Sequence, residues 1–487
     1  MANEYETYDL IIIGGGISGA SVLREAANKG LKSLLIEKND FSSGTSSKSA
    51  KLIHGGLRYL QHLQFKIVRE SLVERNWLLE SHPHLVKPIE FVMPFYGTSL
   101  KYRIAMILYQ MLGKHKTLPK YKFYNKKQTI DKFAEINTKN LKGSFSYYDG
   151  ITNDAKLVSE IIFEAEQYAD IKAINYIEAI KIEDKDNVCY VHCKNTITEE
   201  TIIYKSKVAV NCTGPWADNT LARYQPQSSH IMEPSKGVHL GLPLEKLPIK
   251  AAFAFPSGAN DGRMLYALPW ENDTVILGPT DTTFDGDFDH LSSNKIDIQY
   301  LLHGLNLFAP HAHFTANDIL YSFVGLRPLF NEKGESKDKT RDFKIWWSSE
   351  DIVSLSGGKL TTFRAMGKAA IDKIISKKHL HTTLPTHPFS KPNSRISTLP
   401  KHIKEDYSLI AQEKILEILN EDSQNKEQII DELKVIKGEI IFAIKYLHAK
   451  KIEDIMLRRF SFDYGLQHKK YYNKLKENIE LILKNTL

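Results

Sequence analysis

A glycine-rich turn near the N-terminus constrains the fold of this chain more than any other feature. It follows residues 10–13, an apolar and β-branched run that predicts a buried parallel strand. Residues 14–19 match G-x-G-x-x-G, and residues 17–29 have the pattern of a helix. A second predicted strand, 33–36, is closed by Glu37. This order of elements predicts a βαβ unit that binds a dinucleotide.

The residue types in this unit suit the parts of a dinucleotide. Gly14 allows the tight turn, Gly16 leaves room for the pyrophosphate, and Gly19 allows the helix to pack closely on the strand. The helix N-terminus offers unpaired N–H groups and a positive dipole end to the phosphates. Glu37 is placed to bind a ribose hydroxyl, which favours FAD or NAD over NADP. A glycine turn in an ordinary βαβ unit would leave the position of this acid to chance.

The overall composition is that of a soluble globular enzyme. With 487 residues, the chain is expected to form two or three domains. Its three cysteines predict neither a disulfide framework nor a metal site, which indicates a reducing, cytosolic setting. The N-terminal residues lack the apolar stretch of a signal peptide, and no apolar run is long enough for a transmembrane helix. The net charge of +7 favours an anionic substrate or an anionic membrane surface, and it is too diffuse to indicate nucleic acid.

We predict an α/β protein, α+β overall, with three domains. The first is a discontinuous Rossmann-like cofactor-binding domain, expected at residues 1–90, 145–235 and 345–391. The second is a strand-rich substrate domain with an antiparallel sheet, expected at residues 91–144 and 236–344. The third is an α-helical C-terminal domain, residues 392–487, in which apolar residues recur at helical spacing.

Three further segments are candidates for the cofactor site. Residues 39–51 form a polar loop rich in Ser and Thr, whose hydroxyls can donate to phosphate or ribityl oxygens. Residues 207–214 predict a strand that ends in Thr213 and Gly214, and ligands of doubly wound folds bind at such strand ends. Residues 353–363 repeat the order strand, glycine turn, helix, which favours a second anion-binding helix start.

Residues 91–130 contain no Asp or Glu but many basic, aromatic and aliphatic side chains. The basic residues are Lys101, Arg103, Lys114, Lys116, Lys120, Lys122, Lys126 and Lys127. Such a mixture is typical of an interfacial surface that faces lipid, so this region is a candidate membrane contact. A solvated basic face that guides an anionic substrate explains the same residues equally well.

Taken in order, the motifs of this chain resemble the FAD-dependent glycerol-3-phosphate dehydrogenases of the D-amino-acid-oxidase-like flavoprotein superfamily. The resemblance is carried by IGGGISGA at 13–20, TSS at 45–47, KLIHGGLRYL at 51–60, NCTGPW at 211–216, KGVH at 236–239, GPTD at 278–281, GLRPL at 325–329 and SGGKLTT at 356–362. KLIHGGLRYL and GGKLTT are the most specific of these. Together with the absence of a second G-x-G-x-x-G, they indicate one FAD as the only redox cofactor.

The resemblance, together with the pattern of the βαβ unit, implies a set of FAD-binding residues. They are Gly14, Gly15, Gly16, Ser18, Gly19, Glu37, Lys38, Thr45, Ser46, Ser47, Lys51, His54, Gly55, Gly56, Thr213, Gly214, Gly358, Lys359, Leu360 and Thr361.

The resemblance further implies oxidation of sn-glycerol 3-phosphate to dihydroxyacetone phosphate by hydride transfer from C2 to the flavin. A phosphate dianion needs fixed cations, and Arg can bind it in a bidentate manner. The implied substrate-binding residues are Arg58, Tyr59, Thr280, Arg327 and Lys359, and the implied catalytic residues are His239, Arg327 and Lys359. His239 is the expected base for the C2 hydroxyl, because an imidazole titrates near neutral pH.

A membrane quinone is the expected electron acceptor, because the chain lacks the internal segment that is typical of the related oxidases. The enzyme would then attach peripherally to the cytoplasmic side of the inner membrane, and a homodimer is possible. Three alternatives remain: an oxidase of the same chemistry that uses oxygen, an amine or amino-acid oxidase of the same superfamily, and a flavin-bound scaffold or membrane-docking protein without turnover.

Overall fold

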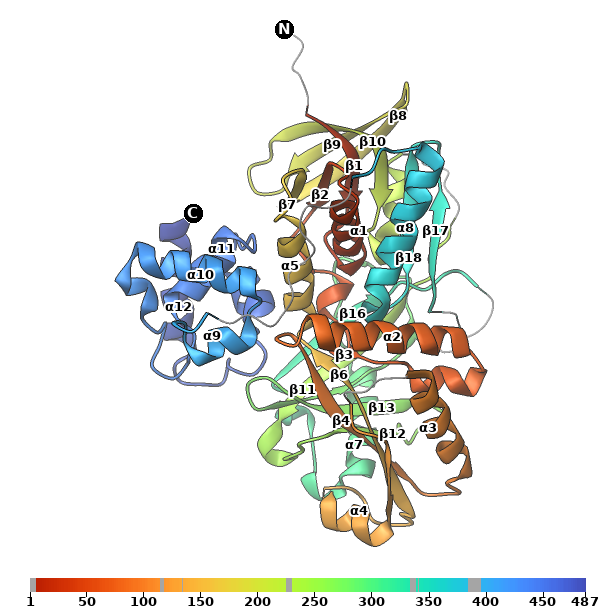
Figure 1. Cartoon of the computed structure of the whole chain (residues 1–487). Helices are drawn as coiled ribbons and strands as arrows, with labels where there is room; N and C mark the ends of the chain where they lie inside the picture. Colours follow the sequence, from red (N-terminus) through yellow and green to blue (C-terminus); the bar gives the residue numbers. More distant parts are fainter. Residues whose placement is uncertain are drawn as a thin grey trace.

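The computed structural model describes residues 6–113, 118–133, 135–224, 230–332, 339, 341–383 and 396–487, without the side chains of Arg58, Gln61, His62 and Lys101. Figure 1 shows one sheet in the upper part of the molecule, a second sheet below it, and the C-terminal helices beside them. The predicted class, α/β with an additional antiparallel sheet and a helical C-terminal domain, is confirmed.

The first sheet is built on parallel strands around the predicted βαβ unit. In spatial order these strands are β18 (Ile352–Gly357), β10 (Thr201–Asn211), β1 (Thr7–Ile13), β2 (Ser33–Glu37) and β7 (Ile171–Asn175). β17 (Phe343–Trp347) pairs antiparallel with β18, while β8 (Ile177–Lys185) and β9 (Val188–Asn195) form a hairpin on β10. The apolar run in β1 is fully buried, which explains its lack of hydrophobic alternation.

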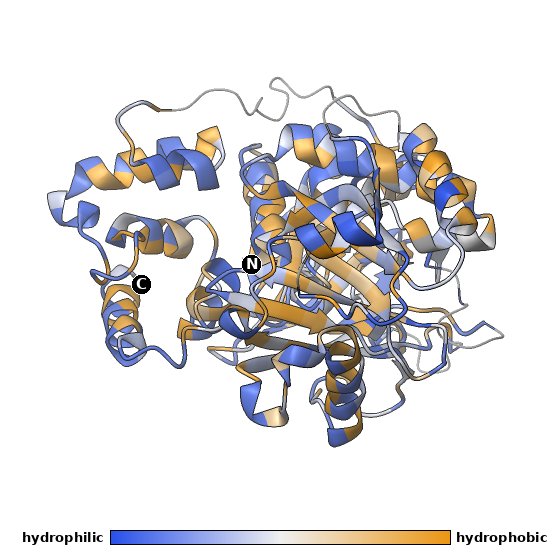
Figure 2. Ribbon diagram, turned by 90° about the horizontal axis from the view of Figure 1, so that it is seen from below, coloured by the Kyte–Doolittle hydropathy of each residue, from blue (hydrophilic) through white to orange (hydrophobic). Residues whose placement is uncertain are grey.

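Three helices cover one face of this sheet (Figure 1). They are α1 (Ile17–Asn28), α5 (Asp154–Ala165) and α8 (Phe363–Lys378), and α1 contacts both of the others. Asn153 caps α5, because its side chain accepts a hydrogen bond from the Lys156 N–H at 3.2 Å. In Figure 2 the strands of the interior are mostly hydrophobic, whereas the helices alternate between hydrophobic and hydrophilic residues. The helices thus turn one face to the sheet and the other to water.

The second sheet is antiparallel apart from one parallel pair, β4 with β12. Its main path runs β15 (Thr282–Thr283), β11 (Ser235–Pro243), β14 (Thr274–Gly278), β13 (Met264–Trp270), β12 (Ala252–Pro256), β4 (Val86–Phe95), β6 (Gly143–Thr152) and β3 (Leu52–Ile53). β16 (Tyr321–Arg327) pairs with β11, and β5 (Lys122–Asn125) pairs with β6. The helices associated with this part are α2 (Phe65–Ser81), α3 (Leu100–Gly113), α4 (Lys126–Lys132) and α7 (Lys295–Phe308).

The C-terminal region forms a separate helical cluster with its own apolar core. It contains α9 (Lys401–Asp406), α10 (Leu409–Glu421), α11 (Lys437–Lys445), the π-helix η9 (Asp454–Arg459) and α12 (Tyr472–Thr486). Ile415, Ile440 and Leu475 are fully buried in this core. Within the described ranges, no helix has both the length and the apolarity required to cross a membrane.

The pairing of strands places three segments differently from the predicted domain boundaries. β3 and residues 86–90 of β4 were expected in the cofactor domain, as was β6 from residue 145, but all three lie in the second sheet. The reason is that β4 and β6 pair along their full length, from Val86 with Thr152 to Phe95 with Gly143. Such pairing depends on contacts between segments about fifty to sixty-five residues apart in sequence, which local pattern does not reveal.

Candidate active site

The glycine-rich turn between β1 and α1 has the geometry that the sequence predicts. Gly14 has a φ of +112°, in the region that favours glycine. A Cβ at Gly19 would lie 1.9 Å from the carbonyl oxygen of Gly14, so a side chain there would prevent the close approach of α1 to the turn. The Ile17 N–H at the start of the helix donates to Ser46 Oγ at 2.9 Å, which joins the turn to the predicted Ser/Thr loop.

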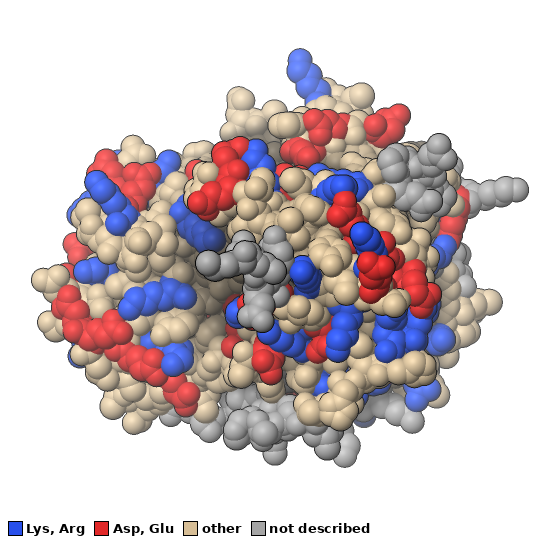
Figure 3. Space-filling view, turned by 90° about the horizontal axis from the view of Figure 1, so that it is seen from above, with Lys and Arg blue, Asp and Glu red and all other residues tan. Residues whose placement is uncertain are grey.

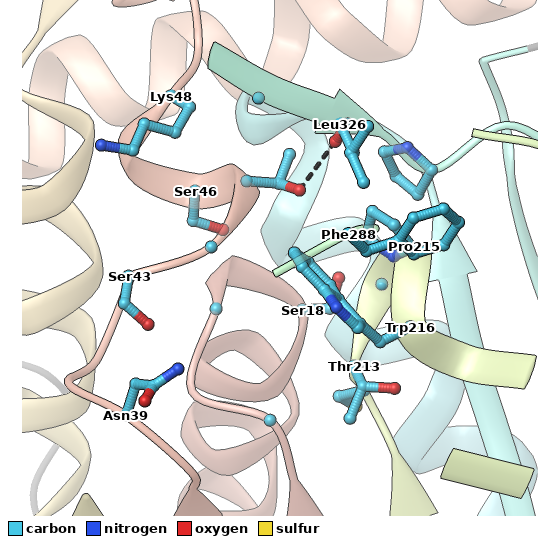
Figure 4. Close-up of a pocket in the computed structure, with 18 of the residues that line it drawn as sticks. Ser18, Asn39, Ser43, Ser46, Lys48, Thr213, Pro215, Trp216, Phe288 and Leu326 are labelled. Atoms are coloured by element: carbon cyan, nitrogen blue, oxygen red, sulfur yellow. Dashed lines mark hydrogen bonds between the residues drawn. The ribbon is translucent and has the colours of Figure 1, made fainter. Parts of the chain in front are cut away.

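A cavity of about 640 Å³ lies at the carboxyl ends of β1, β2, β10 and β18, the edge at which doubly wound folds bind ligands. In Figure 4, Asn39, Ser43 and Ser46 lie on one side of this cavity and Thr213, Pro215 and Trp216 on the other. Leu326 of β16 closes it from the second sheet, and its carbonyl oxygen accepts a hydrogen bond from Thr45 Oγ1 at 2.7 Å. The cavity therefore lies between the two sheets.

The structure brings most of the predicted cofactor residues to this cavity. Those that line it are Gly14, Gly16, Ser18, Glu37, Lys38, Thr45, Ser46, Thr213, Gly214, Gly358, Lys359 and Leu360. Among the described residues, the cavity lining does not include the other predicted ones, namely Gly15, Gly19, Ser47, Lys51, His54, Gly55, Gly56 and Thr361. Lys48 also lines the cavity and was missed by sequence reasoning, although it lies directly beside the predicted Thr45–Ser47 turn.

Glu37 is held at the end of β2 by the backbone of the glycine turn. Its Oε2 accepts a hydrogen bond from the Gly15 N–H at 2.7 Å, and its Oε1 accepts one from the Asn39 N–H at 2.9 Å. Burial raises the pKa of Glu37, and these N–H groups oppose that shift. The predicted ribose-binding acid is thus fixed in orientation beside the cavity.

Lys51 supports the cofactor loop from behind rather than lining the cavity. Its ammonium forms a buried ion pair with Asp154 at 2.6 Å and donates to the Ser47 carbonyl oxygen at 2.7 Å. Asp154 also accepts hydrogen bonds from the Ser49 N–H and hydroxyl. These contacts tie residues 47–51 to the start of α5.

The two motifs most specific to the family resemblance meet in space. The His54 N–H donates to Thr361 Oγ1 at 3.1 Å, and a Cβ at Gly56 would lie 3.5 Å from Lys359 Nζ. Burial, with Lys359 and Arg341 nearby, lowers the pKa of His54 to about 3, so its imidazole is neutral. KLIHGGLRYL (51–60) and GGKLTT (357–362) therefore lie against each other, although about three hundred residues separate them. Together we call these two segments the active-site wall.

A cluster of cationic side chains lies beside this wall. Arg327 donates to the Thr280 carbonyl oxygen at 2.8 Å and lies 3.2 Å from Asp281 Oδ1, while Arg341 lies 3.2 Å from Asp281 Oδ2. Burial lowers the pKa of Arg327 to about 10 and that of Lys359 to about 7, and Arg341 contributes to both shifts. The lowered pKa values indicate that a bound anion would stabilise the charged forms of these side chains.

Sequence reasoning missed Asp281 and Arg341 in this cluster. Asp281 follows the predicted Thr280 directly, so the G-P-T-D motif could have indicated it. Arg341 lies outside every motif that was recognised, and only the fold places its guanidinium beside Asp281.

His239 lies on β11 and is almost completely buried. Its ring stacks on Phe323 with the centroids 4.7 Å apart, and within the described part of the chain neither ring nitrogen has a hydrogen-bond partner. Burial, with Arg327 and Lys51 nearby, holds the pKa of His239 well below its usual range. A Cβ at Gly278 would lie 2.5 Å from the imidazole, so this glycine makes space for the ring. An uncharged imidazole with unused nitrogens is suited to bind a ligand hydroxyl. Its lowered pKa differs from the expected titration near neutral pH and makes it a weaker base, and a bound anion would oppose that shift.

The remaining predicted substrate residues are close to these groups. Thr280 Oγ1 accepts a hydrogen bond from the Val238 N–H at 3.0 Å, next to His239 in the strand. Lys359 Nζ lies 3.8 Å from the centre of the Tyr59 ring. The side chain of Arg58 lies outside the described residues, although its backbone belongs to the same short helix as Tyr59.

The site has the features that a bound dinucleotide requires. A Cβ at Gly214 would meet no atom within 4 Å, so the backbone there faces open space in the cavity. Lys48 supplies a cation, Glu37 a carboxylate and α1 its N-terminus, which match a pyrophosphate and a ribose. The fold and this site define a dinucleotide-dependent oxidoreductase. Residues 9–372 match the family described as FAD dependent oxidoreductase (DAO), and the chain belongs to this family, so its cofactor is FAD.

Comparison with known proteins agrees with the family resemblance of the motifs. A glycerol-3-phosphate dehydrogenase of Synechocystis sp. is 33% identical over 504 residues, covering 94% of this chain and 90% of that protein. An alpha-glycerophosphate oxidase of Streptococcus pyogenes is 38% identical over 337 residues, covering 67% of this chain and 55% of that protein. The X-ray structure of a glycerol-3-phosphate dehydrogenase from Bacillus halodurans, complexed with FAD, has a TM-score of 0.72 at 24% identity and covers 98% of this chain and 95% of that one.

Proposed function

We propose that the protein oxidises sn-glycerol 3-phosphate to dihydroxyacetone phosphate. The observation that carries this proposal is a set of cations at the edge of the cofactor cavity. Lys359 lines the cavity, and Arg327, which shares Asp281 with Arg341, lies near the buried imidazole of His239, whose nitrogens have no partner among the described residues. The names of the Synechocystis and streptococcal relatives point to the same substrate.

The cation cluster is suited to a phosphate dianion. Arg327 and Arg341 share the single carboxylate of Asp281, which leaves positive charge available for an anionic ligand. Lys359 adds a third cation when protonated, and a bound dianion would raise its pKa above the present value of about 7. Guanidinium groups bind phosphate oxygens in a bidentate manner, so they would also fix the orientation of the substrate.

His239 is the proposed base for the C2 hydroxyl. Its imidazole is neutral, and its ring nitrogens are free of described partners, so one can accept the hydroxyl proton. Stacking on Phe323 holds the plane of the ring. When bound, FAD supplies the acceptor for the hydride that leaves C2. Lys359 and Arg327 are the proposed cations that stabilise negative charge on the substrate oxygen.

We further propose a membrane quinone as the electron acceptor, with attachment to the cytoplasmic side of the inner membrane. The outer face of α3 supports this proposal. Its apolar residues Leu100, Ile104, Ile107 and Met111 recur at helical spacing and are 66%, 52%, 45% and 66% exposed. Exposed apolar rows of this kind are characteristic of binding surfaces.

Basic side chains accompany this apolar row. Arg103 on α3 and Lys120 and Lys122 nearby in sequence are exposed, which suits an anionic lipid surface. The predicted Lys114 and Lys116 and the side chain of Lys101 lie outside the described residues. By contrast, the face shown in Figure 3 carries Lys and Arg mixed with Asp and Glu. The inner face of α3 is fixed to the active-site wall, because Tyr109 OH accepts a hydrogen bond from the Gly55 N–H at 2.9 Å.

Anaerobic mixing of the holoenzyme with sn-glycerol 3-phosphate tests the substrate. Bleaching of the oxidised flavin spectrum is expected, and glycerol, sn-glycerol 1-phosphate and glycine serve as controls. A spectrum that stays oxidised with glycerol 3-phosphate but bleaches with glycine would favour an amino-acid oxidase. A spectrum that stays oxidised with all of them would contradict the proposed function.

The electron acceptor requires a separate measurement. A soluble quinone should reoxidise the reduced enzyme faster than air does, with little peroxide formed. Fast reoxidation by oxygen with stoichiometric peroxide would instead identify an oxidase, the activity that the name of the streptococcal relative suggests.

A further inference from the structure

The C-terminal helical domain contacts the cofactor-binding part through a buried charged cluster. Asp40 accepts hydrogen bonds from Arg459 Nη1 at 2.8 Å and Nη2 at 2.7 Å, and also from Arg458 Nε. The side chains of Asp40 and Arg459 are 0% and 1% exposed, and that of Arg458 is 10% exposed. This contact joins η9 to the loop that follows β2, more than four hundred residues away in sequence.

The loop that carries Asp40 is part of the cofactor site. Asn39 and Ser43, on either side of Asp40, line the cavity (Figure 4). The Asp40 carbonyl oxygen accepts a hydrogen bond from the Ser43 N–H at 3.1 Å, and the Gly15 carbonyl oxygen accepts one from the Ser42 N–H at 2.9 Å. One side of the loop is therefore attached to the glycine turn, and the other side is attached to the arginines of η9.

Other contacts hold η9 in position to make this attachment. Asp454 accepts hydrogen bonds from Arg458 at 2.6 Å and from Tyr176 OH at 2.7 Å. Arg459 also donates to the Leu447 carbonyl oxygen, at 3.0 Å from its Nε. Each arginine thus has a second partner besides Asp40, Asp454 for Arg458 and the Leu447 carbonyl for Arg459, as is expected for a supporting layer around a binding site.

Loss of the arginines would change the surroundings of the Asp40 carboxylate. Although burial opposes it, the charges of Arg459 and Arg458 hold the pKa of Asp40 below its usual range. Without them, the buried carboxylate would keep only the Asn175 amide, 3.1 Å from its Oδ1, as a side-chain donor among the described residues, and it could recover hydration only if the loop moved outward. Asn39 and Ser43 would move with it, which would disturb the side of the cavity next to Glu37.

We propose that Arg458 and Arg459 are positioning residues for FAD, which hold the Asn39–Ser43 loop in the conformation that binds the cofactor. The C-terminal domain then contributes to cofactor affinity without touching the cavity through these side chains. This role is separate from the choice of substrate and acceptor.

Substitution Arg459→Met tests the proposal through FAD affinity. Apoprotein is titrated with FAD, and the dissociation constant is read from flavin fluorescence at a temperature at which the far-ultraviolet circular dichroism spectrum is native. We expect the dissociation constant to rise about tenfold or more, by analogy with the loss found when the residues that support the ligands of a metal site are removed. The gain in melting temperature on addition of FAD should shrink in parallel.

Lys87→Met is the matched control. Lys87 on β4 forms an exposed ion pair with Asp406 of α9, at 3.2 Å, and so joins the same C-terminal domain at a place remote from the loop. Its FAD dissociation constant should stay within twofold of that of the unmodified protein. If Arg459→Met also stays within twofold while its apoprotein melts at a lower temperature, the arginines are ordinary domain anchors and the proposal is overturned.

Milder variants cover the case in which the methionine variant does not fold. Arg458→Lys and Arg459→Lys keep a cation beside Asp40 but lose the forked geometry of the guanidinium. A raised FAD dissociation constant in these natively folded variants supports the proposal, and an unchanged one contradicts it.

Discussion

Basic side chains collect in two regions of this molecule, and the two regions differ in their surroundings. Arg327 and Arg341 surround Asp281 beside the cofactor cavity, largely shielded from water. Arg103 and Lys122, near α3, are exposed and lie in a stretch without acidic residues. The same residue types therefore serve in a buried site and on a surface.

The difference shows how burial decides what a cation can do. In the partly buried cluster, loss of hydration and then the charge of Arg341 lower the pKa of Lys359 to about 7. On the surface, water and salt screen each charge, so a single residue contributes little and only the sum attracts an anionic partner. We therefore expect substitutions in the partly buried cluster to have larger effects than those on α3. Salt should affect mainly the surface residues.

The largest effect is expected for Arg327→Met. It would remove the proposed charge-assisted contact to the substrate phosphate and leave Asp281 with one partner fewer, so kcat/KM should fall about 1,000-fold while FAD stays bound. Anaerobic stopped-flow reduction of the flavin measures this. Lys344→Met, which changes an exposed cation on β17, is the matched control. A loss of less than tenfold for Arg327→Met would show that the cluster does not bind the substrate.

His239→Asn should slow the rate at which substrate reduces the flavin by about 100-fold or more, the usual contribution of a general base. Asparagine can still form hydrogen bonds beside Phe323 but cannot take up the proton. The rate with substrate deuterated at C2 distinguishes the steps, because loss of the base should change the size of the isotope effect. A nearly unchanged rate would assign proton removal to another group.

The lowered pKa of Lys359 predicts that kcat/KM depends on pH. Its ammonium is charged below a pKa of about 7 and neutral above it, so kcat/KM should fall about tenfold per pH unit above that value if the charge binds phosphate. The fall in kcat should occur at higher pH, because bound phosphate stabilises the cation. Lys359→Arg should remove the alkaline fall. A rate that rises through pH 7 would instead identify neutral Lys359 as the base.

The smallest effect is expected on α3 and its surroundings. Lys122→Gln should weaken binding to anionic vesicles about fivefold, since each basic residue contributes about 1 kcal/mol there, and the difference should vanish in high salt. Ile104→Ser with Ile107→Ser should weaken binding at all salt concentrations. Sedimentation with vesicles measures both, and Lys368→Gln on α8 is the control. Equal binding of all variants would exclude this surface as the membrane contact.

Several features could be predicted because they depend on residues close in sequence. The strand, glycine turn and helix from residue 7 to 28 were predicted within a few residues, and so was the helical nature of the C-terminal region. The family resemblance also held, because contiguous motifs such as KLIHGGLRYL carry it. The roles given to individual residues stay predictions that the substitutions above can test.

Other features were beyond sequence reasoning because they depend on distant partners. Lys51 was expected at the cofactor, but its ammonium is buried against Asp154, about one hundred residues away in sequence. Arg341 belongs to no motif, yet it shares Asp281 with Arg327. No local sequence pattern predicts which acidic side chain will pair with which basic one.

The sequence by itself determined the class of this protein, its cofactor-binding turn and the residue types of its site, since glycine spacing and contiguous motifs act locally. Only the tertiary structure decided which of those residues face the cavity and which support it. It also brought Arg458 and Arg459 to Asp40, in a contact that spans most of the chain. The physical reason is that a buried charge is stable only beside its partner, and the fold alone determines where that partner lies.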